Sequence, residues 1–182
     1  MLKKLLIAAV VLIILLVGVV VVAALMAPTD FRVERGTTIN KPASEIYSYA
    51  KLLKNQNEWG PWHKKEPTMH QEFRGTDGEV GFVSYWKGTN DEIGEGEQEI
   101  KALIPDKRID TELRFIHPFE SRADAYMILE PAGERQTNVK WGFTGSMPRP
   151  MNLIMLVMDM DSAVGKDFAE GLAGLKTIME SK

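Results

Sequence analysis

The feature that most limits the fold is an uninterrupted apolar segment near the start of the chain. Residues 5–26 contain no charged side chain. A helix of that length measures about 33 Å, which is enough to cross the hydrocarbon core of a bilayer. The alternative is a cleavable signal peptide, but its apolar core has only about 7–15 residues and ends at a small-x-small site. Here the large residues Leu25 and Met26 occupy the place of the small-x-small site. We therefore expect a tail at residues 1–4 and a retained transmembrane anchor at residues 5–27.

Basic residues flank this segment on both sides. Lys3 and Lys4 precede it, and Arg32, Arg35 and Lys41 come after it. The positive-inside rule compares such flanks, so the charge count alone leaves the orientation open. A very short tail before a long apolar stretch is typical of a signal anchor. We therefore expect the tail to stay in the cytoplasm and the remaining chain to be exported.

Length and composition limit the part of the chain beyond the anchor. The chain has 182 residues, and after a linker at residues 28–30 the segment 31–182 has a usual size for one domain. The formal net charge of -3 supplies no basic field, so no nucleic-acid partner is expected. The sequence has no cysteine, and its three histidines lack metal-ligand spacing. It also shows no recognisable catalytic triad and no glycine-rich phosphate loop, so we expect no metal, no cofactor and no catalytic residue.

The region from residue 69 to residue 146 has a two-residue period. Apolar side chains alternate with polar ones most clearly at residues 109–115 and 139–143, which is typical of strands with one buried face. Turn signals rich in Gly, Pro, Asn and Asp divide the region into six strands joined as hairpins. An earlier strand begins at Phe31, and a short helix is expected after Pro42. The sequence thus predicts a seven-stranded antiparallel sheet.

The pattern after Pro150 changes to the helical period and continues to the end of the chain. Because an antiparallel sheet of this size must cover its apolar face, we expect this long helix to lie across the sheet, giving an α+β fold. Gly165 lies inside the helix at a cost of about 1 kcal/mol relative to alanine, so it needs a packing reason. The apolar stripe recurs at three- and four-residue steps and comprises Met151, Ile154, Met155, Met158, Gly165, Phe168, Leu172, Leu175 and Met179.

The order of one strand, two short helices, six strands and a long terminal helix resembles the helix-grip fold of the SRPBCC superfamily. That superfamily includes START lipid-transfer domains and plant pathogenesis-related allergens. More specific motifs lie at residues 57–62, 81–88, 92–96 and 158–172. They are similar to those of a bacterial branch often labelled polyketide cyclase or dehydrase, whose members can carry an N-terminal membrane helix.

The resemblance covers nearly all of residues 31–180. It implies a hollow between the sheet and the terminal helix that accommodates a hydrophobic molecule, and it maps no catalytic signature. It also implies a single-pass protein of the bacterial inner membrane.

Aromatic side chains are the first candidates for the wall of such a hollow. Each could equally fill the core, since apolar ligands and cores are held by the same kinds of surface. Trp59 and Trp62 stand beside Gly and Pro in what reads as a loop, where a ligand mouth or a membrane contact competes with packing. The full aromatic set is Trp59, Trp62, Tyr85, Trp86, Phe115, Phe119, Trp141 and Phe143.

Methionines are the second group of candidates. Met151, Met155 and Met158 fall on the stripe expected to face the sheet, where thioethers either pack or form an adaptable ligand wall. Leu156 and Val157 extend the apolar character to the other faces of the same segment. A segment that is apolar all round is either buried or in contact with lipid. Our hypothesis is that this segment and the tryptophan loop form a ligand entrance that faces the bilayer.

These observations favour membrane-tethered binding or transfer of a small hydrophobic ligand, such as a lipid, in a cavity between the sheet and the C-terminal helix. A cyclase- or hydratase-like enzyme using the same cavity is one alternative, and it requires an inward polar pair, such as Tyr85 or His70 with an acidic neighbour. A ligand-free interaction module at the cell envelope is another, and a filled interior would favour it.

Overall fold

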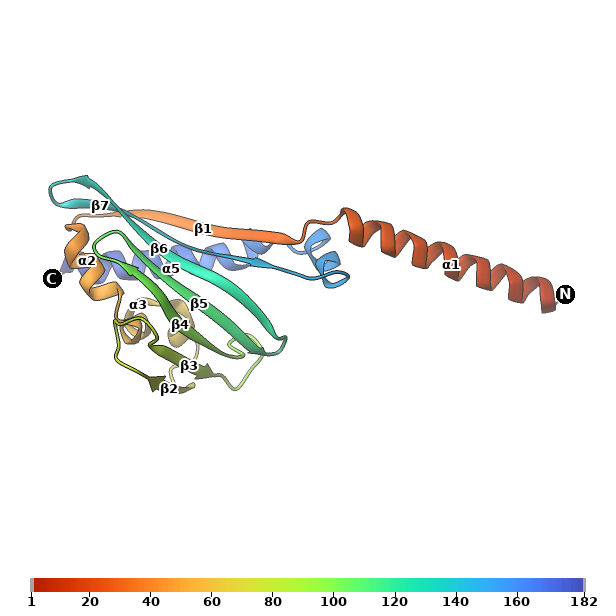
Figure 1. Ribbon diagram of the computed structural model, residues 1–182, viewed down its shortest axis with the longest axis horizontal. Coiled ribbons are helices and arrows are strands. Elements are labelled where there is room, and N and C mark those ends of the chain that lie inside the picture. The colour runs from red at the N-terminus through yellow and green to blue at the C-terminus, as the bar shows by residue number, and fades with distance from the viewer. Residues whose placement is uncertain (1, 182) are drawn as a thin grey trace.

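The computed structural model describes residues 2–181, in which a helix at the N-terminal end projects from a body made of one sheet and one long helix (Figure 1). The N-terminal half contains α1 (Leu2–Met26), β1 (Asp30–Ile39), α2 (Ala43–Ala50), the 3-10 helix η1 (Leu53–Asn55), α3 (Gln56–Trp59) and α4 (Pro61–Lys65). The remaining elements are β2 (His70–Arg74), β3 (Val83–Lys87), β4 (Glu95–Ile104), β5 (Arg108–His117), β6 (Ser121–Gly133), β7 (Gln136–Ser146), the 3-10 helix η2 (Met151–Leu156) and α5 (Met160–Ser181).

The strands in residues 2–181 form one seven-stranded sheet in the order β1-β7-β6-β5-β4-β3-β2. Strands β2 to β7 follow one another as hairpins, and every neighbouring pair is antiparallel. The first strand pairs with the last along its whole length, from Asp30 opposite Ser146 to Ile39 opposite Thr137. The predicted antiparallel meander closed by the first strand is therefore confirmed.

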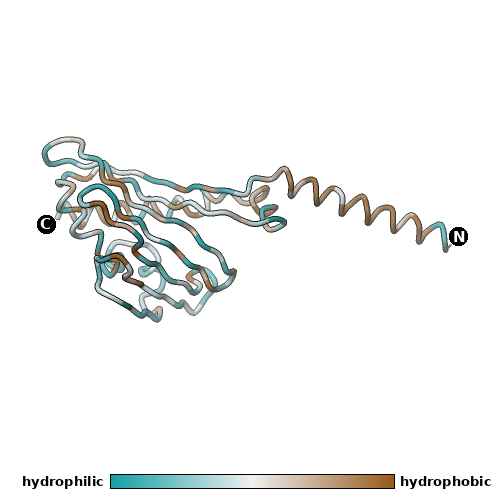
Figure 2. Tube along the Cα trace, in the orientation of Figure 1, coloured by the Kyte–Doolittle hydropathy of each residue, from teal (hydrophilic) through white to brown (hydrophobic). Residues whose placement is uncertain are grey.

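Helix α5 covers one face of the sheet, and the core lies between them. Odd-numbered residues of the central strands, such as Ile109, Met127 and Trp141, point to this inner face and are buried. Phe168 and Leu175 of α5 pack onto them with almost no exposure. Figure 2 shows the alternation of hydropathy along these strands and the almost continuous apolar character of α1. The predicted α+β fold is confirmed, and the two-residue period is its cause.

The C-terminal helix starts later than the sequence suggested. The expectation of one helix from Pro150 is wrong, because η2 ends at Leu156 and α5 begins only at Met160. Asp159 explains the new start, since its carboxylate accepts hydrogen bonds from the Asp161 N–H at 3.0 Å and the Ser162 hydroxyl at 2.6 Å. Such an aspartate is a helix N-cap. Met151, Met155 and Met158 consequently lie before α5 and outside its buried stripe.

Gly165 makes room for a charged side chain. A Cβ atom at this position would lie 1.9 Å from the Arg35 Nη2 atom. The guanidinium of Arg35, from β1, crosses α5 here and donates to both carboxylate oxygens of Asp161 at 2.7 and 2.8 Å. The packing reason for this glycine is therefore an ion pair between the edge strand and the first turn of α5.

The last turn of α1 is held by the domain. Asn152, which is fully buried, donates from its amide nitrogen to the carbonyls of Ala24 at 2.8 Å and Ala27 at 3.1 Å. Arg149 donates to the Ala24 carbonyl at 3.0 Å. The terminal carbonyls of a helix have no partners within the helix, so these side chains cap α1. Within residues 2–181, α1 is the helix that is long and apolar enough to cross a membrane, a property that signal sequences share.

Candidate functional site

The predicted tryptophan loop is two short helices, and its tryptophans point inward. Trp59 ends α3, and Trp62 lies in α4, which begins at Pro61 because proline suits the first helical position. Trp59 is fully buried, and the interpretation of it as part of an open loop was wrong. Its indole nitrogen has no hydrogen-bond partner among the described residues, which leaves one free donor in the interior.

Five aromatic rings fill the middle of the space between α5 and the sheet. Trp141 stands edge-on to Trp59, Trp62 and Phe168, with ring centroids 4.8, 5.7 and 4.3 Å apart. Phe143 stacks on Phe168 at 5.6 Å. Edge-to-face and offset arrangements at these separations are favourable contacts beyond simple burial. Four predicted site residues, Trp59, Trp62, Trp141 and Phe143, thus meet in a packed cluster.

Trp86 and Phe115 extend the inner face toward β3, whereas Tyr85 lies on the other face. The Trp86 ring packs edge-on against Phe115 at 6.2 Å and covers Gly96, where a Cβ would lie 2.7 Å from the ring. Tyr85 points outward and donates to the Glu95 carboxylate at 2.8 Å, and this hydrogen bond raises the Tyr85 pKa. The alternation along β3 therefore separates two neighbouring predicted site residues.

The outer face of the sheet carries a network of ion pairs. Arg114 donates to Glu97 at 2.8 Å and to Glu99 at 2.7 Å, and it also contacts Glu112. Burial opposes the ionisation of Glu97, but hydrogen bonds from Arg114 and Arg74 hold the Glu97 pKa below its usual range. His70 is exposed on the same face and hydrogen-bonds to Glu72. These carboxylates and His70 are thus paired with their neighbours on the face opposite α5.

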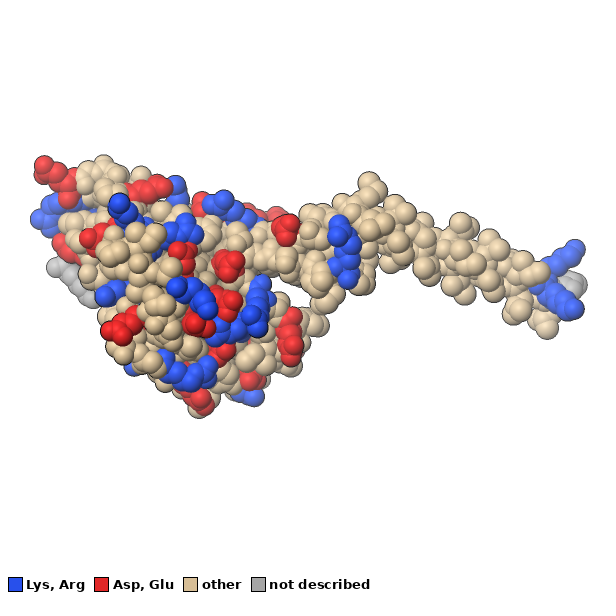
Figure 3. Space-filling model, in the orientation of Figure 1, with Lys and Arg blue, Asp and Glu red and all other residues tan. Residues whose placement is uncertain are grey.

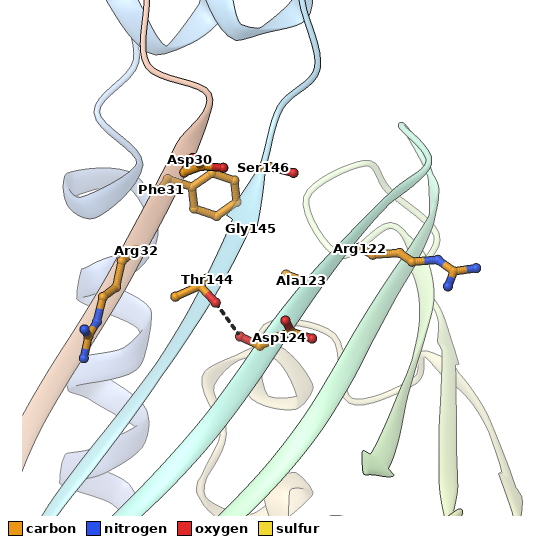
Figure 4. Close-up of a pocket in the computed structure, with 9 residues that line it drawn as sticks. All are labelled: Asp30, Phe31, Arg32, Arg122, Ala123, Asp124, Thr144, Gly145 and Ser146. Atoms are coloured by element: carbon orange, nitrogen blue, oxygen red, sulfur yellow. Dashed lines mark hydrogen bonds between the residues drawn. The ribbon is translucent and has the colours of Figure 1, made fainter.

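Two hollows open at the end of the sheet from which α1 extends. The first has a volume of about 550 Å³ and lies between β1, β6 and β7. Figure 4 shows Phe31, Thr144 and Asp124 around it, with Arg122 pointing away from them. The lining residues of this first hollow are Asp30, Phe31, Arg32, Arg122, Ala123, Asp124, Thr144, Gly145 and Ser146.

The second hollow, of about 380 Å³, lies between β1 and the segment 155–161. Phe31 and Arg32 line both hollows. The Phe31 ring packs on Phe143 at 5.3 Å, so it connects the hollows to the aromatic cluster. Met155 and Met158 are the predicted site residues in this lining.

Both hollows are lined by charged and apolar side chains. Asp124 and Arg122 line the first, and Leu156 and Val157 line the second together with Asp159 and Asp161. Arg32, shared by both, is held by hydrogen bonds to Glu34 at 2.6 Å and Tyr126 at 3.0 Å. These contacts raise the pKa of Arg32, the Glu34 hydrogen bond most strongly. Neighbouring hollows with both polar and apolar lining residues can accommodate a molecule with a polar head and an apolar tail.

Exposed apolar side chains gather at the same end. Outside α1, the described residues include ten exposed large hydrophobic side chains, and seven of them lie in β5, the β5–β6 turn and the segment 151–158. Val157 is the most exposed at 87%, and Phe119 follows at 68%. Met151 and Met158 are also exposed. These three predicted site residues, Phe119, Met151 and Met158, therefore lie at the surface beside the hollows.

Sequence reasoning missed Phe31, Arg32 and Asp124 as lining residues. Position in the chain was the available signal for Phe31 and Arg32, because they come a few residues after the apolar helix α1. Asp124 carried no comparable signal, since it lies on an ordinary alternating strand. Among residues 2–181, no group of three or more His, Asp or Glu side chains is arranged to hold a metal ion.

No family model and no curated protein matches the sequence. Solved structures do match it. Protein MLL2253 from Mesorhizobium loti aligns with a TM-score of 0.59 at 16% identity, over 84% of this chain and 98% of that one. The Aha1 protein of Colwellia psychrerythraea, solved as a dimer, aligns with a TM-score of 0.55 at 16% identity, over 82% and 96%.

The structure named Ara h 8.0201 aligns with a TM-score of 0.50 at 17% identity, over 84% of this chain and 99% of that one. At such identities the likeness is one of fold. The alignments cover most of this chain and almost all of the matched chains. The chain therefore has the α+β helix-grip fold of these structures, in which an antiparallel sheet wraps around a long C-terminal helix.

Proposed function

We propose that this protein is a membrane-anchored domain that binds or transfers a small hydrophobic molecule with a polar head, such as a lipid. The observation that carries the proposal is the position of the two hollows. Both lie at the end of the sheet where α1 leaves the domain, and both share Phe31 and Arg32. A molecule leaving the bilayer beside α1 reaches these hollows first.

The two linings suggest how such a ligand is held. Met155 and Leu156 can cover part of an apolar tail, and each 100 Å² of apolar surface removed from water contributes about 2.5 kcal/mol. Tighter binding then depends on the head contacting Arg32 and Asp124 in the first hollow. The volume of the first hollow, about 550 Å³, falls in the usual range for small-molecule sites.

We infer the cellular place from the anchor. Helix α1 crosses the bacterial inner membrane once, and the domain lies on the exported side, as the short basic tail favours. Because β1 starts four residues after α1 ends, the domain stays close to the membrane surface. The bilayer is then the nearest source of an apolar ligand.

One observation favours a second candidate function. The aromatic cluster around Trp141 and Phe168 fills the middle of the space that a deep ligand would need. A domain without a ligand, which contacts a partner protein at the cell envelope, has no need of such a space. The two candidates differ in whether a small molecule accompanies the purified protein.

Native mass spectrometry of the detergent-purified full chain, followed by extraction of lipids, separates them. Thr144→Trp places a large ring in the first hollow, and Thr68→Trp makes the same change at an exposed turn. We expect an amphiphile to accompany the natural protein and the Thr68→Trp variant, and to be lost from Thr144→Trp. The absence of any bound molecule from repeated preparations would refute ligand binding and favour the envelope module.

A further inference from the structure

We propose that the domain makes a second contact with the bilayer, beside the one made by α1. In this contact the segment 151–158 and the β5–β6 turn insert apolar side chains into the interfacial layer of the same leaflet. We call these two elements the contact surface. The inference rests on the membrane anchoring proposed above and goes beyond ligand binding, because it assigns a partner to exposed apolar side chains of which only some line the second hollow.

The junction with α1 prevents free rotation of the domain. Asn152 is buried and donates to the carbonyls of Ala24 and Ala27, and Arg149 donates to the carbonyls of Ala24 and Leu25. The Met147 N–H donates to the Thr29 carbonyl at 2.8 Å, which extends the sheet into the linker. With both sides of the linker held, the direction of α1 sets the pose of the domain over the membrane.

That pose turns the contact surface toward the bilayer. Figure 1 shows η2 beside the end of α1, and the tip of the β5–β6 hairpin pointing toward the side from which α1 extends. Leu156 and Val157, 56% and 87% exposed, project from the first element, and Phe119, 68% exposed, from the second. Single exposed apolar side chains are ordinary, but two elements far apart in sequence present them on one side here.

The bilayer is the occupant that the surroundings favour. Figure 3 shows that the surface of α1 carries no charged side chain between its first turn and the junction. The segment 151–158 lies beside the end of α1, since Asn152 donates to the carbonyls of Ala24 and Ala27. Charged side chains cover the body of the domain instead. An apolar face that adjoins a membrane span lies at the depth where Leu, Phe and Met side chains enter the boundary between headgroups and acyl chains.

Single cysteines can test the contact, because the natural sequence has none. Val157→Cys and Phe119→Cys report on the contact surface. Ile104→Cys is the matched control, since Ile104 is apolar and 47% exposed but ends β4 at the opposite end of the sheet. Each full-length variant is labelled with an environment-sensitive fluorophore and placed in phosphatidylcholine and phosphatidylglycerol vesicles that contain nitroxide lipid.

We expect the nitroxide lipid to quench labels 157 and 119 at least threefold more strongly than label 104. Equal quenching at all three positions would overturn the second contact. Flotation of the same vesicles measures anchoring by α1 separately. Protein that floats but shows no extra quenching refutes the contact alone, whereas protein that does not float refutes the anchoring as well. Lipid extraction on the unlabelled protein continues to decide ligand binding.

The junction has its own test. Asn152→Leu removes the cap of α1 in the Val157→Cys background, and thermal unfolding checks that the domain remains folded. Arg149→Gln is the second variant and changes an exposed side chain, so folding is preserved. We expect quenching of label 157 to fall toward the control value in either variant. Unchanged quenching in the folded variants would overturn the claim that the junction sets the pose.

Discussion

Replacing Phe168 by alanine tests whether the aromatic cluster is core or ligand wall. Phe168 is 2% exposed, and its ring contacts Trp62, Trp141 and Phe143 at centroid separations of 6.0, 4.3 and 5.6 Å. Truncating a fully packed Phe costs about 3–5 kcal/mol, because both transfer energy and the cavity left behind count. For a domain of this size that loss lowers the melting temperature by roughly 6–20 °C.

Phe119→Ala is the matched control. It makes the same chemical change at a side chain that is 68% exposed, so we expect the free energy of unfolding to change by no more than about 0.5 kcal/mol. Denaturant unfolding in detergent, followed by tryptophan fluorescence, measures both variants. A cost below about 1 kcal/mol for Phe168→Ala would show that the ring borders an open space and would refute the packed-core argument.

Two further predictions concern charge and backbone. Burial opposes ionisation of Glu97, yet two arginines hold its pKa below the ordinary value of 4.5, so its contribution to stability is complete above pH 4.5 and lost as the pH falls through the lowered value. We expect Glu97→Gln to reduce the loss of unfolding free energy at acid pH. Glu134→Gln, at the exposed β6–β7 turn, is the control and should leave that loss unchanged. If the Glu97→Gln curve of stability against pH runs parallel to that of the natural protein, the ion-pair network is contradicted. At Gly94, with a φ of +64°, an added Cβ would lie 2.4 Å from the His117 carbonyl oxygen, whereas Gly81, with a φ of +89°, faces open space. Gly81→Ala should therefore cost about 1–2 kcal/mol from backbone strain alone and Gly94→Ala about 1–3 kcal/mol more, and equal costs in thermal unfolding would contradict this.

The sheet was predictable because its signal is local. In β5 and β7 the residues that alternate in polarity also alternate between faces, as at Ile109 and Trp141, and turn residues mark the hairpins. The long apolar helix α1 was predictable for a similar reason, since its length and composition are local properties. The start of α5 was missed because the helical spacing of apolar residues continues through Met155 and Met158. Asp159, which caps the helix, cannot be told apart by sequence from other charged residues nearby.

The candidate site was less accessible to sequence reasoning because it depends on which elements end side by side. An aromatic side chain has the same preference for a core as for a ligand wall, so Trp59 could not be placed before its packing against Trp141 of β7 was known. The hollow around Phe31 and Asp124 forms where β1 pairs with the β6–β7 hairpin, and Phe31 lies opposite Gly145, more than ninety positions later in the chain. No local sequence pattern indicates which distant strands will pair.

The cap on α1 has a consequence for biosynthesis. Asn152 and Ala24, which it joins, are 128 residues apart in the sequence. At a synthesis rate of about 5–20 residues per second, roughly 6–26 s pass between the synthesis of Ala24 and that of Asn152. The interval between the synthesis of the edge strand β1 and that of its partner β7 is almost as long. During this interval the nascent chain presents an unpaired strand, and such non-local closure is slow to fold. The order of synthesis thus makes α1 the first helix to be made, and its orientation to the domain is fixed only after β7 and Asn152 have followed.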